Sequence, residues 1–175
     1  MKITTPRLTL KPATVDLAPL VWRAVEVSLV ELSPWMAWAR DVTPEAQEEW
    51  IRGLDAAGER AFIVFDGEEV AGTVGLGRVE PCIRAASIGY WTRSDAAGRG
   101  YATEAVAAVV EHAFAELGLH RLELRAGVDN HGSNRVARKL GFRLEGVARH
   151  GCCGAYGHYD ANVYGLLADD PRLAP

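Results

Sequence analysis

The sequence predicts a mixed α+β fold, formed by a single domain over residues 1–175. Two observations carry this prediction: segments in which polar and apolar residues alternate, as in half-buried strands, and segments in which apolar residues recur every three or four positions, as in amphipathic helices. The composition, with 49% hydrophobic and 24% charged residues, is typical of a globular chain with a buried core.

The first third of the chain predicts one strand and two helices. Residues 7–13 alternate as a strand does, and a first helix is expected from Asp16 to about Ser28. A second helix is expected to begin after Thr43, which offers an N-cap and is followed by a proline and a glutamate. This helix should stop before Gly58.

The middle of the chain predicts an antiparallel meander of three strands. The strands are expected at residues 61–66, 69–79 and 85–92, with a turn at Asp66-Gly67 and a proline break after the second strand. Gly89 interrupts the third strand, which suggests a bulge or a close backbone approach at that point.

The second half predicts a long helix after Gly100, because apolar residues recur at helical spacing through Leu117. A strand, a short helix and two further strands follow. They are expected at residues 121–128, 133–140, 142–150 and 161–168. Strands followed by helix, strand, helix and two strands define the α+β class.

The start of the long helix is unusual. The first turn of a helix favours acidic residues, yet this one is preceded by Gly98, Arg99 and Gly100. Two glycines leave the first backbone N–H groups uncovered and the arginine adds positive charge, which suits a bound anion. Two known phosphate-binding motifs do not match this stretch. The lysine of a P-loop is missing, and the third glycine of a dinucleotide-binding loop is replaced by Thr at position 103. A glycine-rich loop without a ligand remains the alternative.

The charge balance argues against two classes of partner. A net charge of −4 and a pI near 5.7 disfavour a dedicated nucleic-acid binder. The beginning of the chain lacks the apolar core of a signal peptide, and no window has the length of a membrane span. We therefore expect a soluble, cytoplasmic protein that does not bind membranes.

The cysteines do not suggest a disulfide framework. Cys82, Cys152 and Cys153 are three in number and two are adjacent, which fits a reducing compartment. His150 and His158 flank the adjacent pair, but without a C-x-x-C spacing ordinary thiols and loop histidines are favoured over a zinc site. We expect no metal.

Two blocks of the sequence carry a family resemblance. "IGYWTRSDAAGRGYATEAVAAVVEHAF", followed by "GVDNHGSNRVARKLGFRLEG", resembles the GCN5-related N-acetyltransferases (GNAT) and, within them, the Rim-type branch that acetylates ribosomal-protein N-termini. The family pattern Q/R-x-x-G-x-G/A falls on residues 97–102, with Ala97 in place of Gln or Arg. The second block matches at Asn130, Ser133 and residues 139–142, and weaker similarity extends over nearly the whole chain.

The resemblance implies a seven-stranded, mostly antiparallel sheet with about four helices and two splayed parallel strands at its centre. It also implies acetyl-coenzyme A as co-substrate and suggests a homodimer. The coenzyme pyrophosphate would lie on the N–H groups of residues 98–103, and the pantetheine arm would pair with a strand backbone. The implied coenzyme contacts are Tyr90, Trp91, Thr92, Gly98, Arg99, Gly100, Tyr101, Ala102, Thr103, Asn130, Ser133, Asn134 and Lys139.

Basic side chains near these blocks have two interpretations. Arg93 and Arg99 flank the glycine-rich loop, and Arg135, Arg138 and Lys139 lie on the following helix. They could contact coenzyme phosphates or simply be solvated surface cations.

The resemblance also suggests catalytic groups. Ser133 stands where the family carries a hydroxyl near the coenzyme sulfur, so it is our candidate acid for the departing thiolate, although a serine there is also an ordinary helix cap. Rim-type enzymes have been thought to use a glutamate near the position of Cys152. Glu80 is the candidate carboxylate that remains, as a base or as a partner for the substrate ammonium, and it could equally only decorate a strand end.

The expected acceptor is an N-terminal α-amine of a protein or peptide. Deprotonating an α-amine at pH 7 costs roughly 1 kcal/mol, against roughly 4 to 5 kcal/mol for a lysine, so a weak base suffices. Trp35 and Trp38 fall where the family builds its acceptor cleft, although aromatic pairs at this spacing also occur in cores. A small amine as acceptor, and a coenzyme A-binding sensor without catalysis, remain the alternatives.

Overall fold

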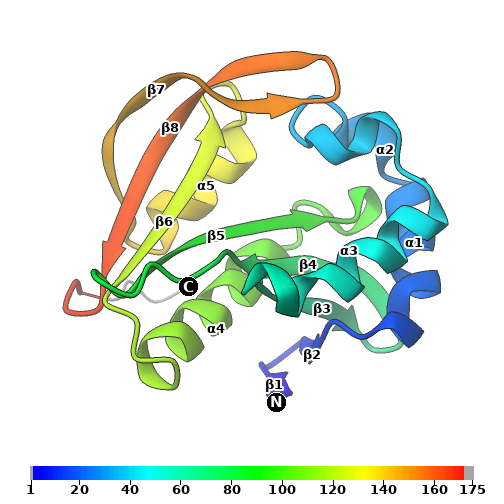
Figure 1. Cartoon of the computed structure of the whole chain (residues 1–175), viewed down its shortest axis with the longest axis horizontal. Coiled ribbons are helices and arrows are strands. Elements are labelled where there is room, and N and C mark those ends of the chain that lie inside the picture. Colours follow the sequence, from blue (N-terminus) through cyan, green and yellow to red (C-terminus); the bar gives the residue numbers. More distant parts are fainter. Residues whose placement is uncertain (1, 172–175) are drawn as a thin grey trace.

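The computed structural model describes residues 2–171 and contains one twisted sheet covered by helices on both faces (Figure 1). The strands are β1 (Ile3–Thr4), β2 (Thr9–Pro12), β3 (Arg60–Asp66), β4 (Glu69–Leu76), β5 (Ala85–Thr92), β6 (Arg121–Gly127), β7 (Arg143–Gly154) and β8 (Gly157–Leu167). The α-helices are α1 (Ala18–Glu26), α2 (Leu29–Leu32), α3 (Pro44–Ala57), α4 (Tyr101–Ala115) and α5 (His131–Lys139). Residues 2–171 also contain the short 3₁₀ turns η1 (Val15–Leu17), η2 (Ala37–Arg40) and η3 (Ser94–Ala96).

The predicted α+β class is confirmed, with more elements than expected. Within residues 2–171 the sheet has eight strands in the order β1-β2-β3-β4-β5-β6-β8-β7, and every neighbouring pair is antiparallel except β5 and β6. The expectation of seven strands and four helices missed β1 and α2. Both are very short, two and four residues, so they carry almost no periodic signal.

Helix α3 has the boundaries that the sequence predicts. The hydroxyl of Thr43 accepts a hydrogen bond from the N–H of Ala46 at 3.2 Å, and a proline occupies the first helical position. Gly58 ends the helix with φ +71°, a left-handed conformation that a residue without a Cβ adopts readily. Local chemistry alone therefore determines both ends of this helix.

The two faces of the sheet pack against different helices. On β3, Phe62 and Val64 belong to the core beneath α4, whereas Ile63 and Phe65 pack with α1. Successive strand residues point to opposite faces, so this alternation gives the sheet two apolar faces. Within the described residues no helix is long and apolar enough to cross a membrane.

Strands β5 and β6 separate soon after they begin. Their parallel pairing joins only Ala85–Ser87 to Arg121–Glu123, while β6 stays paired with β8 along its whole length. The expected splay is thus present, but the bulge suggested at Gly89 is not, because the β4–β5 register passes through Gly75 and Gly89 without a shift. The divergence leaves one edge of each strand unpaired in the middle of the sheet.

Candidate active site

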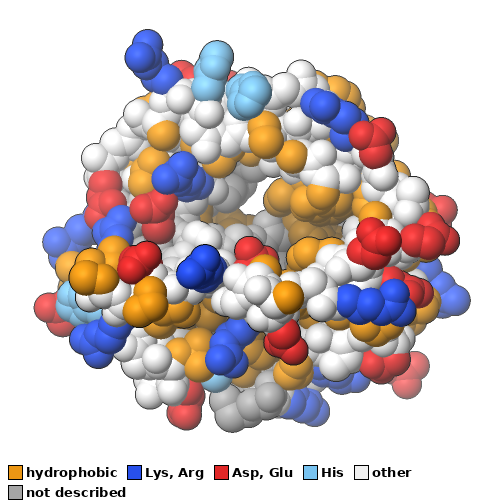
Figure 2. All heavy atoms as spheres, in the orientation of Figure 1, with side chains coloured by type: hydrophobic (Ala, Val, Ile, Leu, Met, Phe, Trp, Pro, Cys, Tyr) orange, Lys and Arg blue, Asp and Glu red, His pale blue; other side chains and the backbone are white. Residues whose placement is uncertain are grey.

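A large cavity opens where β5 and β6 diverge. Its volume is about 1230 Å³, and its walls come from β5, β6, the starts of α4 and α5, the segment between α2 and α3, and the β7–β8 hairpin. Figure 2 shows a hollow at the corresponding place, with hydrophobic side chains gathered on its right-hand side. The expected coenzyme contacts Tyr90, Trp91 and Thr92 all line it.

The loop before α4 presents free backbone donors to this cavity. Gly98 and Gly100 have φ values of +77° and +83°, and a Cβ added to Gly98 would meet no atom within 4 Å. In the described part of the chain, no acceptor contacts the backbone N–H groups of residues 98 to 103, and the first helical bond runs from Glu104 to Gly100. The geometry is that of an anion site at a helix N-terminus.

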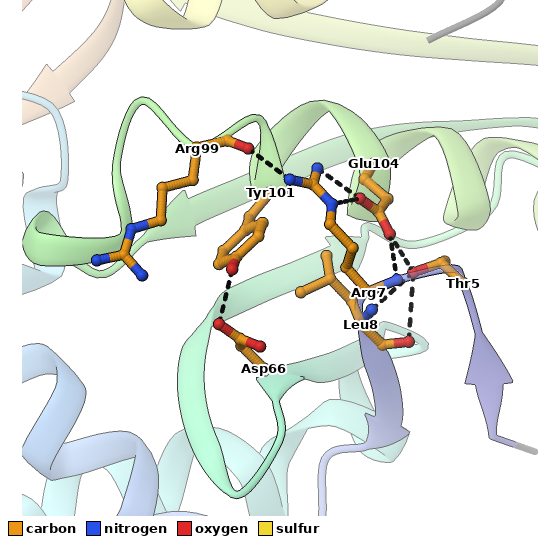
Figure 3. A network of polar contacts seen from close by, with 7 residues as sticks. All are labelled: Thr5, Arg7, Leu8, Asp66, Arg99, Tyr101 and Glu104. Carbon is orange, nitrogen blue, oxygen red and sulfur yellow. Dashed lines mark hydrogen bonds and ion pairs between the residues drawn. The ribbon is translucent and has the colours of Figure 1, made fainter.

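Some of the predicted cations face the cavity and others do not. Arg135 and Lys139, on α5, are among its lining residues. Arg93 instead pairs with two carboxylates, at 2.9 and 2.6 Å, and the side chain of Arg99 points away from the contacts at the start of α4 (Figure 3). Arg99 contributes its carbonyl oxygen, which accepts from Arg7 at 2.8 Å.

Ser133 lies in the cavity wall with a partner that the sequence did not suggest. Its hydroxyl is 2.9 Å from the hydroxyl of Tyr90, which reaches across from β5. Burial raises the pKa of Tyr90 to about 12, so this phenol stays protonated at neutral pH. The alternative role of Ser133 as a helix cap is wrong, because Asn130 is the N-cap of α5 and its Oδ1 accepts from the N–H of Ser133 at 3.0 Å.

The side chain of Asn134 is buried and holds parts of the fold together. Its Nδ2 donates to the carbonyls of Gly127 and Asn130, both at 2.8 Å, and its Oδ1 accepts from Asn162 at 2.6 Å and Tyr164 at 2.7 Å. The side chain is buried and all four of its hydrogen-bonding positions are used. The expectation that it contacts a coenzyme is therefore corrected: it ties α5 to β6 and β8.

The catalytic role expected of Glu80 is not supported by the geometry, because Glu80 is not among the residues that line the cavity, although Gly77 and Ser87 are. The backbone of Glu80 pairs with Ala85. Ala85 comes five residues before Tyr90 on β5, so these two residues are roughly 17 Å apart along the strand. The carboxylate of Glu80 accepts from the N–H of Cys82 at 3.3 Å and is exposed. The alternative interpretation, decoration of a strand end, is the one that this geometry fits.

The opposite side of the cavity is aromatic. Trp35 packs edge-on against Tyr159, with ring centroids 5.7 Å apart, and both rings lie over Gly127, where a Cβ would come within 2.7 Å of the indole. Trp38 lies 6.3 Å from Trp91, centroid to centroid. Trp35 and Trp38 thus line the cavity as expected. Tyr159 was missed, since its strand begins four residues before the predicted one.

Cys152 lines the cavity beside Tyr159. Burial raises the pKa of the Cys152 thiol and also raises the pKa of Tyr159, to about 12, so both are protonated at neutral pH. Nearby, the rings of His150 and His158 stack with centroids 6.0 Å apart. No group of three or more His, Cys, Asp or Glu side chains within residues 2–171 is arranged to hold a metal ion.

The tip of the β7–β8 hairpin is joined to the segment after α2. The N–H of Ala155 donates to the carbonyl of Ser33, Nε of Arg40 donates to the carbonyl of Ala155, and the hydroxyl of Tyr159 donates to the carbonyl of Trp35, each at 2.8 Å. These contacts make an arch over the cavity. In Figure 1 the tip of the orange hairpin lies beside the segment near α2. No local pattern in the sequence indicates this arch.

The fold is that of an acetyltransferase. The family model of the acetyltransferase (GNAT) domain matches residues 7–143, so the chain belongs to this family. Among curated proteins, it is 33% identical over 111 residues to the ribosomal-protein-serine acetyltransferase of Escherichia coli K12. That alignment covers 63% of this chain and 62% of the relative, less than two thirds of its length.

Solved structures agree over a longer range. The ribosomal L7/L12 α-N-protein acetyltransferase RimL, in complex with coenzyme A, superposes with a TM-score of 0.88 at 25% identity, covering 95% of this chain and 98% of that one. Mycobacterium smegmatis RimJ, in complex with a coenzyme A disulfide, gives 0.86 at 26% identity, covering 97% and 87%. The chain is therefore similar to Rim-type acetyltransferases over nearly its full length.

Proposed function

We propose that this protein transfers an acetyl group from acetyl-coenzyme A to the N-terminal α-amine of a protein or peptide. The observation that carries the proposal is the row of uncovered N–H groups at residues 98–103, which faces a cavity that continues between the splayed strands. An anion with a long, flexible, hydrogen-bonding arm fits this shape. The coenzyme A complexes of RimL and RimJ support the same ligand.

In this proposal the pyrophosphate binds the N–H groups before α4, where the helix dipole also favours negative charge. Arg135 and Lys139 offer cations to a further phosphate on the same cavity wall. The pantetheine arm pairs with the free edge of β5 at Tyr90–Thr92, as an added strand would. This places the thioester toward Ser133.

The transfer then needs no covalent enzyme intermediate. The neutral amine attacks the thioester carbonyl, the tetrahedral intermediate loses its amine proton to water, and the C–S bond breaks. Ser133 donates its proton to the departing thiolate and is reprotonated from solvent. The Tyr90 hydroxyl, held protonated, donates to the serine oxygen and directs the serine proton toward the sulfur.

The residues that line the cavity favour an α-amine as the acceptor. Cys152 and Tyr159 are protonated at neutral pH and cannot act as bases, and the carboxylates that line the cavity are Glu31, Asp41 and Glu59. Glu31 already accepts from the hydroxyl of Ser94 at 2.9 Å. Among residues 2–171 no carboxylate hydrogen-bonds to Ser133, whose partners are Tyr90 and Asn130, so an amine that loses its proton readily is favoured. The arch favours a chain end that enters between the tryptophans.

Acetylation of a peptide with a free N-terminus and one internal lysine tests this acceptor class. We expect acetyl groups almost only on the α-amine, located by tandem mass spectrometry, because the lysine costs roughly 3 to 4 kcal/mol more to deprotonate at pH 7. Acetylation mainly of the lysine would contradict the proposal. A parallel panel of polyamines and small amines, followed by thiol release, separates the alternatives: turnover with small amines only, or coenzyme binding without turnover, would each overturn it.

The pH dependence of kcat/KM for the acceptor should follow the acceptor itself. The rate is expected to rise with pH as the neutral amine becomes more abundant and to level off near the acceptor pKa, about 8 for an α-amine. Tyr90 and Tyr159, with pKa values raised to about 12, add no inflection below that range. Peptides whose α-amine pKa values differ should shift the inflection accordingly. An inflection that stays fixed for every peptide would reveal a base on the enzyme.

A further inference from the structure

The segment before β2 is bound to the start of α4, almost one hundred residues further along the chain. The carboxylate of Glu104 accepts three hydrogen bonds: from the hydroxyl of Thr5 at 2.6 Å, from the N–H of Arg7 at 3.0 Å, and from Nε of Arg7 at 2.7 Å. Nη2 of Arg7 also makes an ion pair with it at 2.6 Å. Burial raises the pKa of Glu104, but these bonds lower it by more, so the carboxylate is ionised at neutral pH.

The remaining guanidinium nitrogen of Arg7, Nη1, binds the loop that precedes α4. Nη1 donates to the carbonyl oxygen of Arg99 at 2.8 Å, and the guanidinium carbon lies 4.9 Å from the centre of the Tyr101 ring. The hydroxyl of Tyr101 in turn donates to Asp66 at 2.7 Å. Figure 3 shows Arg7 lying between Glu104 and this carbonyl, so one rigid planar group connects the helix to the loop that precedes it.

The bond to Arg99 orients a donor on the other side of the loop. In a trans peptide the carbonyl and the N–H of one peptide unit point in opposite directions, and no cis peptide occurs within residues 2–171. The peptide unit that carries the Arg99 carbonyl also carries the N–H of Gly100. When Arg7 holds the carbonyl, the N–H of Gly100, a cavity-lining residue, is directed away from Arg7.

We propose that Arg7 is a positioning residue for the anion-binding loop: it fixes the peptide between Arg99 and Gly100 so that the Gly100 N–H meets the coenzyme pyrophosphate. This inference rests on the proposed function. Arg7 does not touch the ligand in this role. Two glycines give the loop many accessible conformations, and a fixed peptide plane spares the coenzyme the entropy of ordering it.

Two substitutions separate positioning from simple anchoring of the chain. Arg7→Met removes the bond to Arg99 and keeps the length of the side chain. Thr5→Val is the matched control, because it removes a bond from the same segment to Glu104 and leaves the fork of Arg7 in place. Arg7→Met should raise the calorimetric Kd of coenzyme A and the KM of acetyl-coenzyme A by about tenfold, with kcat within about twofold. Thr5→Val should leave all three near wild type.

The ligand-free protein provides an independent measurement. Nuclear magnetic resonance order parameters of residues 99–101 should fall in Arg7→Met, from about 0.85 toward about 0.6, and stay high in Thr5→Val. Unchanged Kd and order in a folded Arg7→Met protein would overturn the positioning role, as would an equal loss in Thr5→Val. Wild-type protein that fails to bind coenzyme A would overturn the proposed function instead, and the order parameters would still test the role of Arg7.

Discussion

Gly98→Asp is expected to abolish most of the affinity for coenzyme A. A Cβ at position 98 meets no atom within 4 Å and the residue lines the cavity, so the new carboxylate fits sterically and lies where the pyrophosphate is proposed to bind. The negative charge of the carboxylate repels the negative charge of the pyrophosphate. The carboxylate also accepts hydrogen bonds from the N–H groups that the phosphate needs. We expect the calorimetric Kd to rise by well over tenfold.

Gly98→Asn is the matched control for this substitution. Asn has the same shape as Asp and tolerates the left-handed conformation that φ +77° requires, so both variants carry a similar backbone cost. Asp also stabilises a helix N-terminus, which protects the fold of the charged variant. The ratio of the two Kd values therefore isolates the charge. Equal affinities in the two variants would mean that no anion binds at this loop.

Local chemistry explains which parts of the fold the sequence predicts well. The ends of α3 follow from Thr43 and Gly58, whose effects reach only a few residues along the chain. The glycines at 98 and 100 similarly account for the positive φ values of the loop before α4, on which the proposed anion site rests. In each case the interaction lies within one turn of the residues that signal it, so no knowledge of the tertiary structure is needed.

Contacts between distant segments explain what the sequence does not predict. Arg7 and the Arg99 carbonyl are 92 positions apart, and Tyr159 reaches the Trp35 carbonyl across 124. Asn134 looks like a ligand contact in a motif, but its side chain is used entirely by hydrogen bonds to β6, to β8 and to the N-cap residue of its own helix. A motif shows that a residue has a role, and only its neighbours show whether the role is to bind a ligand or to hold the scaffold.

Ser133→Ala is expected to lower kcat by as much as about 10²-fold, while the Kd of coenzyme A stays near wild type. The hydroxyl is proposed to act only when the thiolate leaves, so its loss affects the transition state and not the binding of the coenzyme. The N-cap of α5 is Asn130, which the substitution leaves intact. Stability should fall nevertheless, by about 1 to 3 kcal/mol, because the largely buried Tyr90 hydroxyl loses its partner.

A second substitution separates this loss of stability from the loss of catalysis. Tyr90→Phe in the Ser133→Ala background removes the orphaned hydroxyl, so the melting temperature should return toward wild type while kcat stays low. Tyr90→Phe alone keeps the serine proton and removes only its orientation, for which we expect a loss in kcat of about three- to tenfold. Recovery of kcat together with stability in the double variant would show that Ser133 supports the fold and donates no proton.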